Sequence, residues 1–486
     1  MATKQQRFLP LIFLLIILVS LAGGLIWHEK TTDHSGWREE NGVRYYQDFS
    51  GEPVSGWLDL PEGRYYFQED GTPSLGWQTI ENTTYYFGTD GIMLTGWQTV
   101  DGDTCYFGGN GAMVTGWLWL EDGRYYLKDG ALLTGWQELD GKRCYFGADG
   151  AAAEGFTQIG GESYFFVDGA MATGLTEIDG QLYYFDRDGR QYSGWLEEDG
   201  GRRFFGTDGT MLTGWQDMED GRRFFDDSGY LLTGWKEEGE YRYYFKNDGL
   251  MAVGPTQIDG QTHYFSPKGI EVILVNGLNP LPDWYVLDEW TIDDTHTVDK
   301  RCYHALRKML DDCKAAGIEY EFNSGYRTNW TQTAILEYRT REHMKTYSLD
   351  FREARDKALE TVAVPGTSEH QLGLAVDLLG DEAIAWFTQH CWDYGFILRY
   401  TAEKEPITGI IDEPWHFRYV GTEVSLDMKD SGLCLEEYLG AEAVTLQKVH
   451  AYFGEKLYEE TIYGKEAQQS EQAQSDQPAQ DTQAAA

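Results

Sequence analysis

Two short stretches in the C-terminal part of the chain carry residue types that bind a metal ion and activate water. The first, residues 367–377, reads Thr-Ser-Glu-His-Gln-Leu-Gly-Leu-Ala-Val-Asp, and the second, residues 413–416, reads Glu-Pro-Trp-His. Together they supply two imidazoles, one carboxylate and a spare carboxylate. Two histidines and one carboxylate leave an open position on a zinc ion, where a water molecule acquires a pKa of about 7. The two stretches therefore predict a catalytic zinc site.

The local patterns around these residues indicate how they could meet. Residues 374–378 alternate in a way that predicts a strand, which would bury its leucine and valine side chains and present Asp377 on the opposite face. His370 comes shortly before Gly373, where the chain could turn back toward Asp377. His416 alternates with aromatic neighbours, so it could project away from their buried face. We therefore expect His370, Asp377 and His416 to bind Zn2+.

The spare carboxylate, Glu413, is the candidate general base for the water molecule. Residues three apart on a regular strand face opposite sides, so Glu413 and His416 could not both reach the site from an ideal strand. Pro414 lies between them and favours a break in the strand. We therefore expect Glu413 to belong to the preceding loop.

Length and charge limit the kinds of protein this can be. The chain has 486 residues, with 39 basic and 80 acidic side chains and a formal net charge of −41. It is too long for one ordinary domain. Such an acidic surface repels nucleic acid and anionic lipid, so we expect no nucleic-acid partner. A basic or zwitterionic partner, or a neutral polymer, is compatible with this charge.

Residues 1–29 have the composition of a membrane anchor or a signal segment. Lys4 and Arg7 precede residues 8–27, which carry no charged side chain. A helix of this length can span a bilayer, and the basic flank places the N-terminus in the cytoplasm and the rest of the chain outside. Ser20–Ala22 could instead be a signal-peptide cleavage site. Both alternatives predict export, and an uncleaved transmembrane helix is the preferred one.

A unit of nineteen or twenty residues recurs about twelve times between residues 36 and 270. Its mark is Gly followed by Trp, which weakens to Gly155-Phe156 and Gly174-Leu175. Self-similarity over this many units predicts a solenoid. Within one unit, Asp101-Gly102 separates two short extended runs and predicts a β-hairpin. Stacked neighbours would bury the aromatic side chains that a single hairpin leaves exposed.

The repeats resemble the choline-binding and glucan-binding repeats of Gram-positive surface proteins and the carbohydrate-binding repeats of clostridial toxins. The resemblance implies attachment to a wall polymer. Choline-binding repeats usually carry a Trp just before the Tyr pair, where this chain has Thr84, Thr104, Arg143 and Arg203. An aromatic cage for a quaternary ammonium needs several ring faces, so saccharide and choline both remain candidate ligands. The expected polymer-binding rings are Trp57, Trp77, Trp97, Trp117, Trp136, Trp195, Trp215 and Trp235.

The repeat pattern stops near Glu271, and residues 271–464 have the pattern of a mixed α+β domain. The predicted strands are Val272–Leu274, Ile318–Phe322, residues 374–378, Phe396–Tyr400 and Trp415–Val420. The predicted helices are Val298–Ala316, a helix from near Asn329, Phe351–Thr361 and Asp381–Tyr394. Residues 465–486 lack aromatic side chains and are predicted to be disordered. The predicted fold class is therefore multidomain: a transmembrane helix, a β-hairpin solenoid and an α+β domain.

The pattern Ser368-x-His370-x-x-Gly373-x-Ala375-x-Asp377, followed by Glu413-x-x-His416, resembles the D-alanyl-D-alanine carboxypeptidases of the VanY type. These are zinc peptidases with a hedgehog-like fold. Further segments match in the same order, namely residues 279–282, 324–328 with Gln332, 395–400, 408–409, 416–421 and 435–438. The match covers residues 272–439, and no catalytic position is missing.

This resemblance implies a role for each site residue. His370, Asp377 and His416 would bind zinc, and Glu413 would act as general base and then as general acid for the leaving amine.

The resemblance also implies four residues that contact the substrate. Arg327 would stabilise the oxyanion, because it would be a fixed cation beside the scissile carbonyl. Ser368 and Gln332 would hold the terminal carboxylate or the peptide groups. Trp415 would form a wall of the pocket.

We therefore expect an exported, zinc-dependent carboxypeptidase that removes the terminal D-alanine from peptidoglycan stem peptides. Its repeats would hold it at the wall of a Gram-positive-type envelope. An L,D-carboxypeptidase is one alternative, since relatives differ in the stem residue after which they cut. A non-catalytic wall-binding or adhesion protein is the other, although the intact ligand set argues against it. The six cysteines include no Cys-x-x-Cys pair and are expected to be buried thiols.

Overall fold

The computed structural model describes residues 33–459. The chain divides into two compact units between Tyr192 and Ser193. The predicted N-terminal membrane segment and the predicted C-terminal tail lie outside the described residues. Among the helices at residues 33–459, none is long and apolar enough to cross a membrane.

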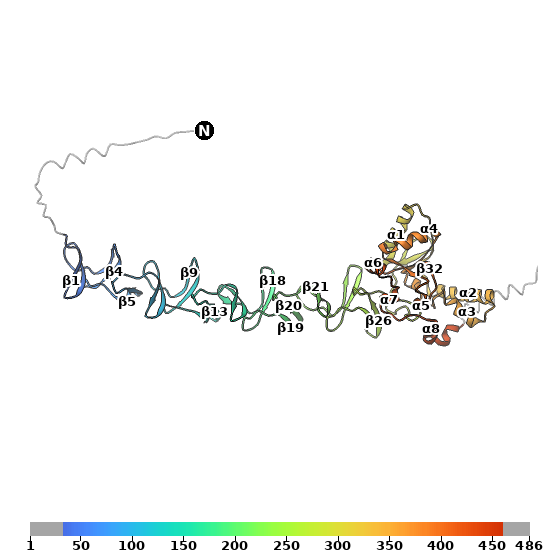
Figure 1. Ribbon diagram of the computed structural model, residues 1–486, viewed down its shortest axis with the longest axis horizontal. Coiled ribbons are helices and arrows are strands. Elements are labelled where there is room, and N and C mark those ends of the chain that lie inside the picture. The colour runs from blue at the N-terminus through green and yellow to red at the C-terminus, as the bar shows by residue number, and fades with distance from the viewer. Residues whose placement is uncertain (1–32, 460–486) are drawn as a thin grey trace, which may run out of the picture. The chain divides into compact units, whose positions relative to one another are not determined.

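Twelve β-hairpins follow one another along residues 36–265, as the repeat period predicts (Figure 1). Two of them carry a short third strand, β11 (Ala131–Leu132) and β16 (Ala170–Met171). The hairpins pair β1 (Gly36–Glu40) with β2 (Val43–Gln47), β3 (Gly56–Leu60) with β4 (Gly63–Phe67), β5 (Gly76–Ile80) with β6 (Thr83–Phe87), β7 (Gly96–Val100) with β8 (Asp103–Phe107), β9 (Gly116–Leu120) with β10 (Gly123–Lys128), β12 (Gly135–Leu139) with β13 (Lys142–Phe146), β14 (Gly155–Ile159) with β15 (Glu162–Val167), β17 (Gly174–Ile178) with β18 (Gln181–Phe185), β19 (Gly194–Glu198) with β20 (Gly201–Phe205), β21 (Gly214–Met218) with β22 (Gly221–Phe225), β23 (Gly234–Glu238) with β24 (Tyr241–Phe245) and β25 (Gly254–Ile258) with β26 (Gln261–Phe265).

The turn chemistry of one repeat shows why this sequence forms hairpins. Asp101 and Gly102 have positive φ values of 54° and 98°, which fit the two-residue turn that joins twisted antiparallel strands. Gly111, in the second turn of the repeat, has a φ of 80°, and a Cβ there would lie 2.1 Å from the sulfur of Met93 in the preceding repeat. This repeat therefore needs a glycine where its neighbour packs against it.

Stacking of neighbouring hairpins buries their aromatic side chains. The Trp97 ring contacts Tyr106 of its own hairpin at 4.9 Å and Tyr125 of the next hairpin at 5.0 Å. Phe107 is completely buried and contacts the ring of Trp77 in the preceding hairpin at 5.9 Å. One hairpin alone could not supply this core, so each repeat depends on its neighbours.

Strand register corrects the position of one repeat residue. Thr84 pairs with Thr79, two residues after Trp77, whereas the partner of Glu197, two residues after Trp195, is Arg202. The equivalent of Thr84 is therefore Arg202 and not Arg203.

The C-terminal domain contains a four-stranded antiparallel sheet of order β29-β30-β32-β31. Its strands are β29 (Glu321–Ser324), β30 (Ala375–Leu379), β31 (Phe396–Tyr400) and β32 (Glu413–Tyr419), and β27 (Glu289–Thr291) pairs separately with β28 (Thr297–Asp299). The α-helices are α1 (Lys300–Ala315), α2 (Asn329–Tyr347), α3 (Phe351–Ala358), α4 (Asp381–His390), α5 (Glu405–Thr408), α6 (Thr422–Ser431), α7 (Leu435–Tyr438) and α8 (Leu446–Phe453), with 3-10 turns η1 (Glu369–Leu372), η2 (Cys391–Tyr394) and η3 (Gly454–Tyr458).

The apolar face of this sheet forms the main core. Leu374, Val376 and Leu378 pack with the buried face of α1 and with Phe387 of α4. The predicted alternation in residues 374–378 is confirmed, because Asp377 lies on the face away from this core. All six cysteines are buried thiols without a disulfide, as expected.

Three sequence predictions about strands differ from the structure. The strand predicted at Ile318–Phe322 is β29, which begins only at Glu321. Val272–Leu274 belongs to no strand; Val272 donates a backbone hydrogen bond to Tyr264, and the segment runs through a hydrophobic core instead. Glu413 is not in a loop but is the first residue of β32.

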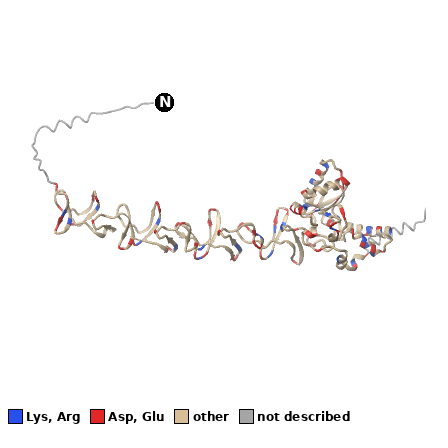
Figure 2. Ribbon diagram, in the orientation of Figure 1, with Lys and Arg blue, Asp and Glu red and all other residues tan. Residues whose placement is uncertain are grey.

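Acidic side chains are spread over the structure. Figure 2 shows Asp and Glu along the hairpins and over the C-terminal domain rather than gathered at one place. The negative charge is therefore a general surface property and does not by itself mark a binding site.

The last hairpins and the C-terminal domain share a hydrophobic core. Ile270 packs in one cluster with Val420 and Leu439, and Tyr241 lies against the same cluster. The Tyr419 hydroxyl donates a hydrogen bond to Glu240 at 2.9 Å. The predicted boundary at residues 270/271 therefore cuts through a continuous core.

Truncation at that boundary should destabilise the domain. Because loss of Ile270 and the tyrosines uncovers apolar surface, we expect a chain starting at Glu271 to lose about 3 kcal/mol or more of unfolding free energy relative to one starting at Ser193. Urea unfolding of both chains measures the difference. Equal midpoints would show that the last hairpins contribute nothing to this core.

Candidate active site

His370 is positioned by a short 3-10 turn that ends at a glycine. Gly373 has a φ of 67°, and a Cβ there would lie 2.8 Å from the backbone nitrogen of Asp299, so only glycine fits. The Nδ1 of His370 lies 2.7 Å from the carbonyl oxygen of Gly325. Because a carbonyl only accepts, Nδ1 carries the proton, and the lone pair on Nε2 is left facing Asp377.

Asp377 and His416 lie side by side on adjacent strands of the sheet. They are direct partners in the pairing of β30 with β32. The His416 Nδ1 lies 3.1 Å from Asp377 Oδ1, and the His370 Nε2 lies 3.3 Å from Asp377 Oδ2. The three side chains are buried, and one ligand atom of each lies within 4.8 Å of the others. The predicted ligand set is brought together.

This donor set fits a zinc ion. Two imidazole nitrogens and one carboxylate are the usual protein ligands of a catalytic zinc site, which keeps a further position open. The Gly325 carbonyl fixes the tautomer of His370, as supporting groups do in such sites.

An irregular strand solves the problem of reach for Glu413. In the pairing of β31 with β32, Leu398 pairs with Phe417, but Tyr400 pairs with Glu413, so β32 has two extra residues there. Such a bulge re-aims side chains. The Glu413 Oε2 therefore lies 3.9 Å from His416 Nδ1, on the same side as the ligand set. The expected reach of Glu413 is confirmed, although a bulge and not a loop provides it.

Burial and neighbouring charges set the protonation of the site. Burial raises the pKa of Glu413 to about 7, and the nearby Asp377 carboxylate adds to this effect. Burial alone would raise the pKa of Asp377 as well, but the two histidines hold it well below its usual range. For His416, hydrogen bonds to Asp377 and Glu369 outweigh burial and raise the pKa to about 9. The site therefore attracts positive charge, and Glu413 can bind and release a proton near neutral pH.

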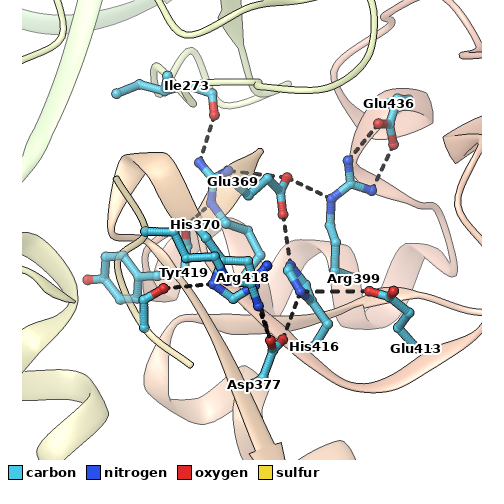
Figure 3. Close-up of polar contacts among 12 residues, drawn as sticks. Ile273, Glu369, His370, Asp377, Arg399, Glu413, His416, Arg418, Tyr419 and Glu436 are labelled. Atoms are coloured by element: carbon cyan, nitrogen blue, oxygen red, sulfur yellow. Dashed lines mark hydrogen bonds and ion pairs between the residues drawn. The ribbon is translucent and has the colours of Figure 1, made fainter. Parts of the chain in front are cut away.

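A buried ionic network supports His416 from behind (Figure 3). Glu369 Oε2 lies 3.4 Å from the Nε2 of His416. Its other oxygen accepts from the Arg399 Nε at 2.8 Å and lies 3.2 Å from an Arg418 nitrogen. Arg399 is in turn held by both oxygens of Glu436 at 2.6 and 2.9 Å. These side chains are almost completely buried, so their charges depend on one another.

The sequence reading gave none of these four residues a role. Each lies in a segment that matched the VanY pattern: Glu369 directly precedes His370, Arg399 lies in residues 395–400, Arg418 in 416–421 and Glu436 in 435–438. The available signal was the presence of charged residues within otherwise apolar strands and motifs, because a buried charge needs a partner. Pairing over 30 to 49 residues of sequence could not be predicted from local patterns.

Glu369→Gln should weaken metal binding. A glutamine cannot hold the His416 Nε2 proton and balance two arginines, so we expect zinc affinity to fall about 10–100-fold. Competition with a chromophoric chelator measures it, and Glu382→Gln, an exposed change on α4, is the matched control. An unchanged zinc affinity would mean that Glu369 does not orient His416.

One cavity of about 480 Å3 contains the remaining predicted site residues. Arg327 donates to Asp377 Oδ2 at 2.6 Å and to the Ser324 hydroxyl at 2.8 Å. Gln332 donates to the Ala363 carbonyl at 2.9 Å, and its own carbonyl oxygen is buried with no hydrogen-bond partner. Ser368 and Trp415 line the same cavity. All eight site residues expected in this domain therefore surround one space.

Fold and site together define a metal-dependent hydrolase domain that follows a series of aromatic hairpin repeats. A family model described as "D-alanyl-D-alanine carboxypeptidase" (VanY) matches residues 295–422. Models described as "Choline-binding repeat" match residues 94–132 and 172–213, and a model of cell wall binding repeats matches residues 76–93 and 233–251.

Curated relatives give the same result. The chain is 40% identical over 178 residues to a D-alanyl-D-alanine carboxypeptidase of Enterococcus faecalis, covering 35% of this chain and 66% of that protein. It is 38% identical over 152 residues to the bifunctional D-Ala-D-Ala dipeptidase and carboxypeptidase VanXYC of Enterococcus gallinarum, covering 28% of this chain and 75% of that protein. A crystal structure of a VanY D,D-pentapeptidase mutant with Zn(II) is 40% identical, with a TM-score of 0.33, over 34% of this chain and 97% of that one.

Through its C-terminal domain the chain belongs to the VanY family of D-alanyl-D-alanine carboxypeptidases. The hairpins that precede this domain are repeats of the choline-binding, cell-wall-binding type. Both resemblances stated from the sequence are confirmed.

Proposed function

We propose that the C-terminal domain hydrolyses the peptide bond before the terminal D-alanine of peptidoglycan stem peptides, and that the repeats hold it at the cell wall. The observation that supports the proposal most strongly is the convergence of His370, Asp377 and His416 beside Glu413 in one cavity. This is a ligand set with a separate base, the arrangement that metal-assisted peptide hydrolysis uses.

Zinc is the metal that this site suits. It would be held through His370 Nε2, the Asp377 carboxylate and His416 Nδ1, which are the atoms that converge. A bound zinc ion polarises the scissile carbonyl and lowers the pKa of water.

Glu413 is the residue we assign to proton transfer. Its pKa of about 7, raised by burial, lets it accept a proton near neutral pH and release it again. It would take the proton as the water oxygen bonds to the carbonyl carbon. It would then give that proton to the amine nitrogen as the carbon–nitrogen bond breaks, and free D-alanine leaves.

Four residues would bind and orient the substrate. Arg327 lies at the edge of the ligand set and would donate to the oxygen on which negative charge develops. The unpaired carbonyl oxygen of Gln332 would accept a substrate N–H, because a buried acceptor without a partner is costly. Ser368 would donate to the terminal carboxylate, and Trp415 would form a wall of the cavity.

The location follows from the repeats and from the charge pattern of the N-terminal residues. The repeats support association with the extracellular wall, where the stem peptides are. The N-terminal segment with Lys4 and Arg7 would tether the protein to the membrane or direct its secretion.

A direct test is incubation of the full chain, loaded with zinc, with a pentapeptide stem and with a tetrapeptide stem. Mass spectrometry of the products gives the result. Loss of one alanine from the pentapeptide alone is the expected outcome. Cleavage of the tetrapeptide alone would replace the proposal by L,D-carboxypeptidase action, and cleavage of neither would leave a wall-binding protein.

A further inference from the structure

Six repeat tryptophans carry an arginine of their own hairpin on the ring face. The guanidinium carbon lies 3.8 to 4.6 Å from the ring centroid in each case. The pairs are Arg44 on Trp37, Arg64 on Trp57, Arg143 on Trp136, Arg202 on Trp195, Arg222 on Trp215 and Arg242 on Trp235. A cation this close to an indole ring is attracted by the ring's electrons, so the Trp face in this hairpin is a cation site.

Carboxylates hold most of these arginines in place. Arg202 pairs with Glu197 at 2.7 Å and Arg222 with Asp217 at 3.3 Å, across the two strands of one hairpin. Arg64 and Arg242 have equivalent partners at 3.5 and 3.6 Å. Such an arginine is part of the chain, so covering the ring costs it no translational freedom. A free cation loses that freedom on binding and would also have to displace the arginine.

Two successive hairpins lack this arginine. Thr84 and Thr104 occupy the equivalent positions, and no Lys or Arg lies over Trp77 or Trp97 in the described part of the chain. Each open ring keeps two of the three ring contacts of Trp57, because Cys105 and Leu127 stand where Tyr85 and Phe87 lie beside Trp57. Trp77 contacts Tyr86 at 5.0 Å and Phe107 at 5.9 Å, as Trp57 contacts Tyr66 at 5.1 Å and Phe87 at 5.9 Å.

Trp77 also has features that favour a cation. Its side chain is 40% exposed, whereas the six arginine-covered tryptophans, like Trp97, are partly buried. The indole N–H donates to Asp101 Oδ2 of the next hairpin at 2.9 Å, which places a carboxylate at the ring edge. At Trp97, two tyrosine rings stand edge-on at 4.9 and 5.0 Å and enclose the indole.

Trp117, the next ring along the chain, differs from these two. Arg124 of its hairpin is held by Glu154 and lies 3.5 Å from Asp168. The turn at Gly169 approaches so closely that a Cβ there would lie 3.2 Å from the indole. This ring is therefore covered by another part of the repeats.

We propose that Trp77 and Trp97 are the two quaternary-ammonium sites of the repeats, and that the six arginine-covered tryptophans are closed to such ligands. The inference rests on the proposed wall attachment and names its ligand class: a quaternary ammonium group carried by a wall polymer. The proposal excludes a uniform set of sites with one site in each repeat. The arginine in the closed repeats occupies the place that the ligand takes in the open ones.

Calorimetric titration of the full chain with choline chloride tests the proposal. We expect two equivalents to bind. Thr84→Arg/Thr104→Arg, which gives both open hairpins the residue that six others carry, should weaken binding about tenfold or more. The matched control is Leu182→Arg/Thr262→Arg, which adds the same charge at the same position of two hairpins without a tryptophan, and it should bind as the wild type does. Arg64→Thr should add a third equivalent at Trp57.

The outcomes separate this inference from wall attachment. Choline binding that the threonine-to-arginine changes leave intact, or a stoichiometry near one per repeat, would overturn the inference. A wild-type chain that sediments with choline-bearing walls but binds no choline would overturn it too, while attachment would stand. A chain that sediments with no wall would refute both. Near-UV circular dichroism of each variant reports that the aromatic rings of the repeats are still packed.

Discussion

Glu413→Gln should lose about 10²–10⁴-fold in kcat/KM for D-alanine release, because the amide keeps the shape of the side chain but cannot accept a proton. The bulge in β32 gives Glu413 its place beside His416, at 3.9 Å, and burial raises its pKa to about 7. No other carboxylate of the cavity is free for this task, since Asp377 is a ligand and Glu369 is engaged by two arginines. The measurement is the rate of D-alanine release from a pentapeptide.

Two controls make this result specific. The zinc content of Glu413→Gln should equal that of the wild type, because Glu413 lies outside the ligand set. Asp412→Asn removes the neighbouring carboxylate, which does not line the cavity, and should leave the rate unchanged. If Glu413→Gln retained a rate within tenfold of the wild type, Glu413 would not be the general base.

Removal of the metal should abolish hydrolysis and also lower stability. His370, Asp377 and His416 are buried, so a bound cation stabilises their charge and lone pairs. Only the folded state brings these three ligands together. With free zinc at about 1,000 times its dissociation constant, binding stabilises the folded state by about 4 kcal/mol. We therefore expect the chelated protein to be inactive, and added zinc to restore its activity and raise its Tm.

Ligand variants distinguish this site from adventitious zinc binding. His370→Ala and His416→Ala should each lose the rise in Tm with zinc, while His304→Ala should keep it, because His304 packs on Trp290 away from the cavity. The same rise in all three variants would place the zinc elsewhere. This readout does not depend on catalysis, so it tests the ligand assignment by itself.

The sequence by itself determined the elements whose signals are local. The twelve hairpins follow from the repeat period and from turns such as Asp101-Gly102, where the dipeptide suits the positive φ angles of a tight turn. The start of α2 at Asn329 and the whole of β31 were also predicted correctly, because capping and alternation are short-range patterns. The ligands His370, Asp377 and His416 could be named because a motif fixes their spacing.

Only the tertiary structure decided how distant residues meet. The bulge that turns Glu413 toward His416 depends on the pairing of β32 with β31, and no local pattern marks it. The network of Glu369, Arg399 and Glu436 joins residues 30 and 37 apart in the sequence. Burial in a common core determines their partners, because each charge there requires an opposite one.

The repeats show the same division. The Gly-Trp period determined which rings recur, but it gave every Trp the same expected role. Pairing across each hairpin decides whether an arginine covers the ring, as at Trp57, or a threonine leaves it open, as at Trp77. The fusion of the last hairpins with the C-terminal core at Ile270 likewise depends on surfaces that meet only after folding, since apolar burial responds to contact and not to sequence position.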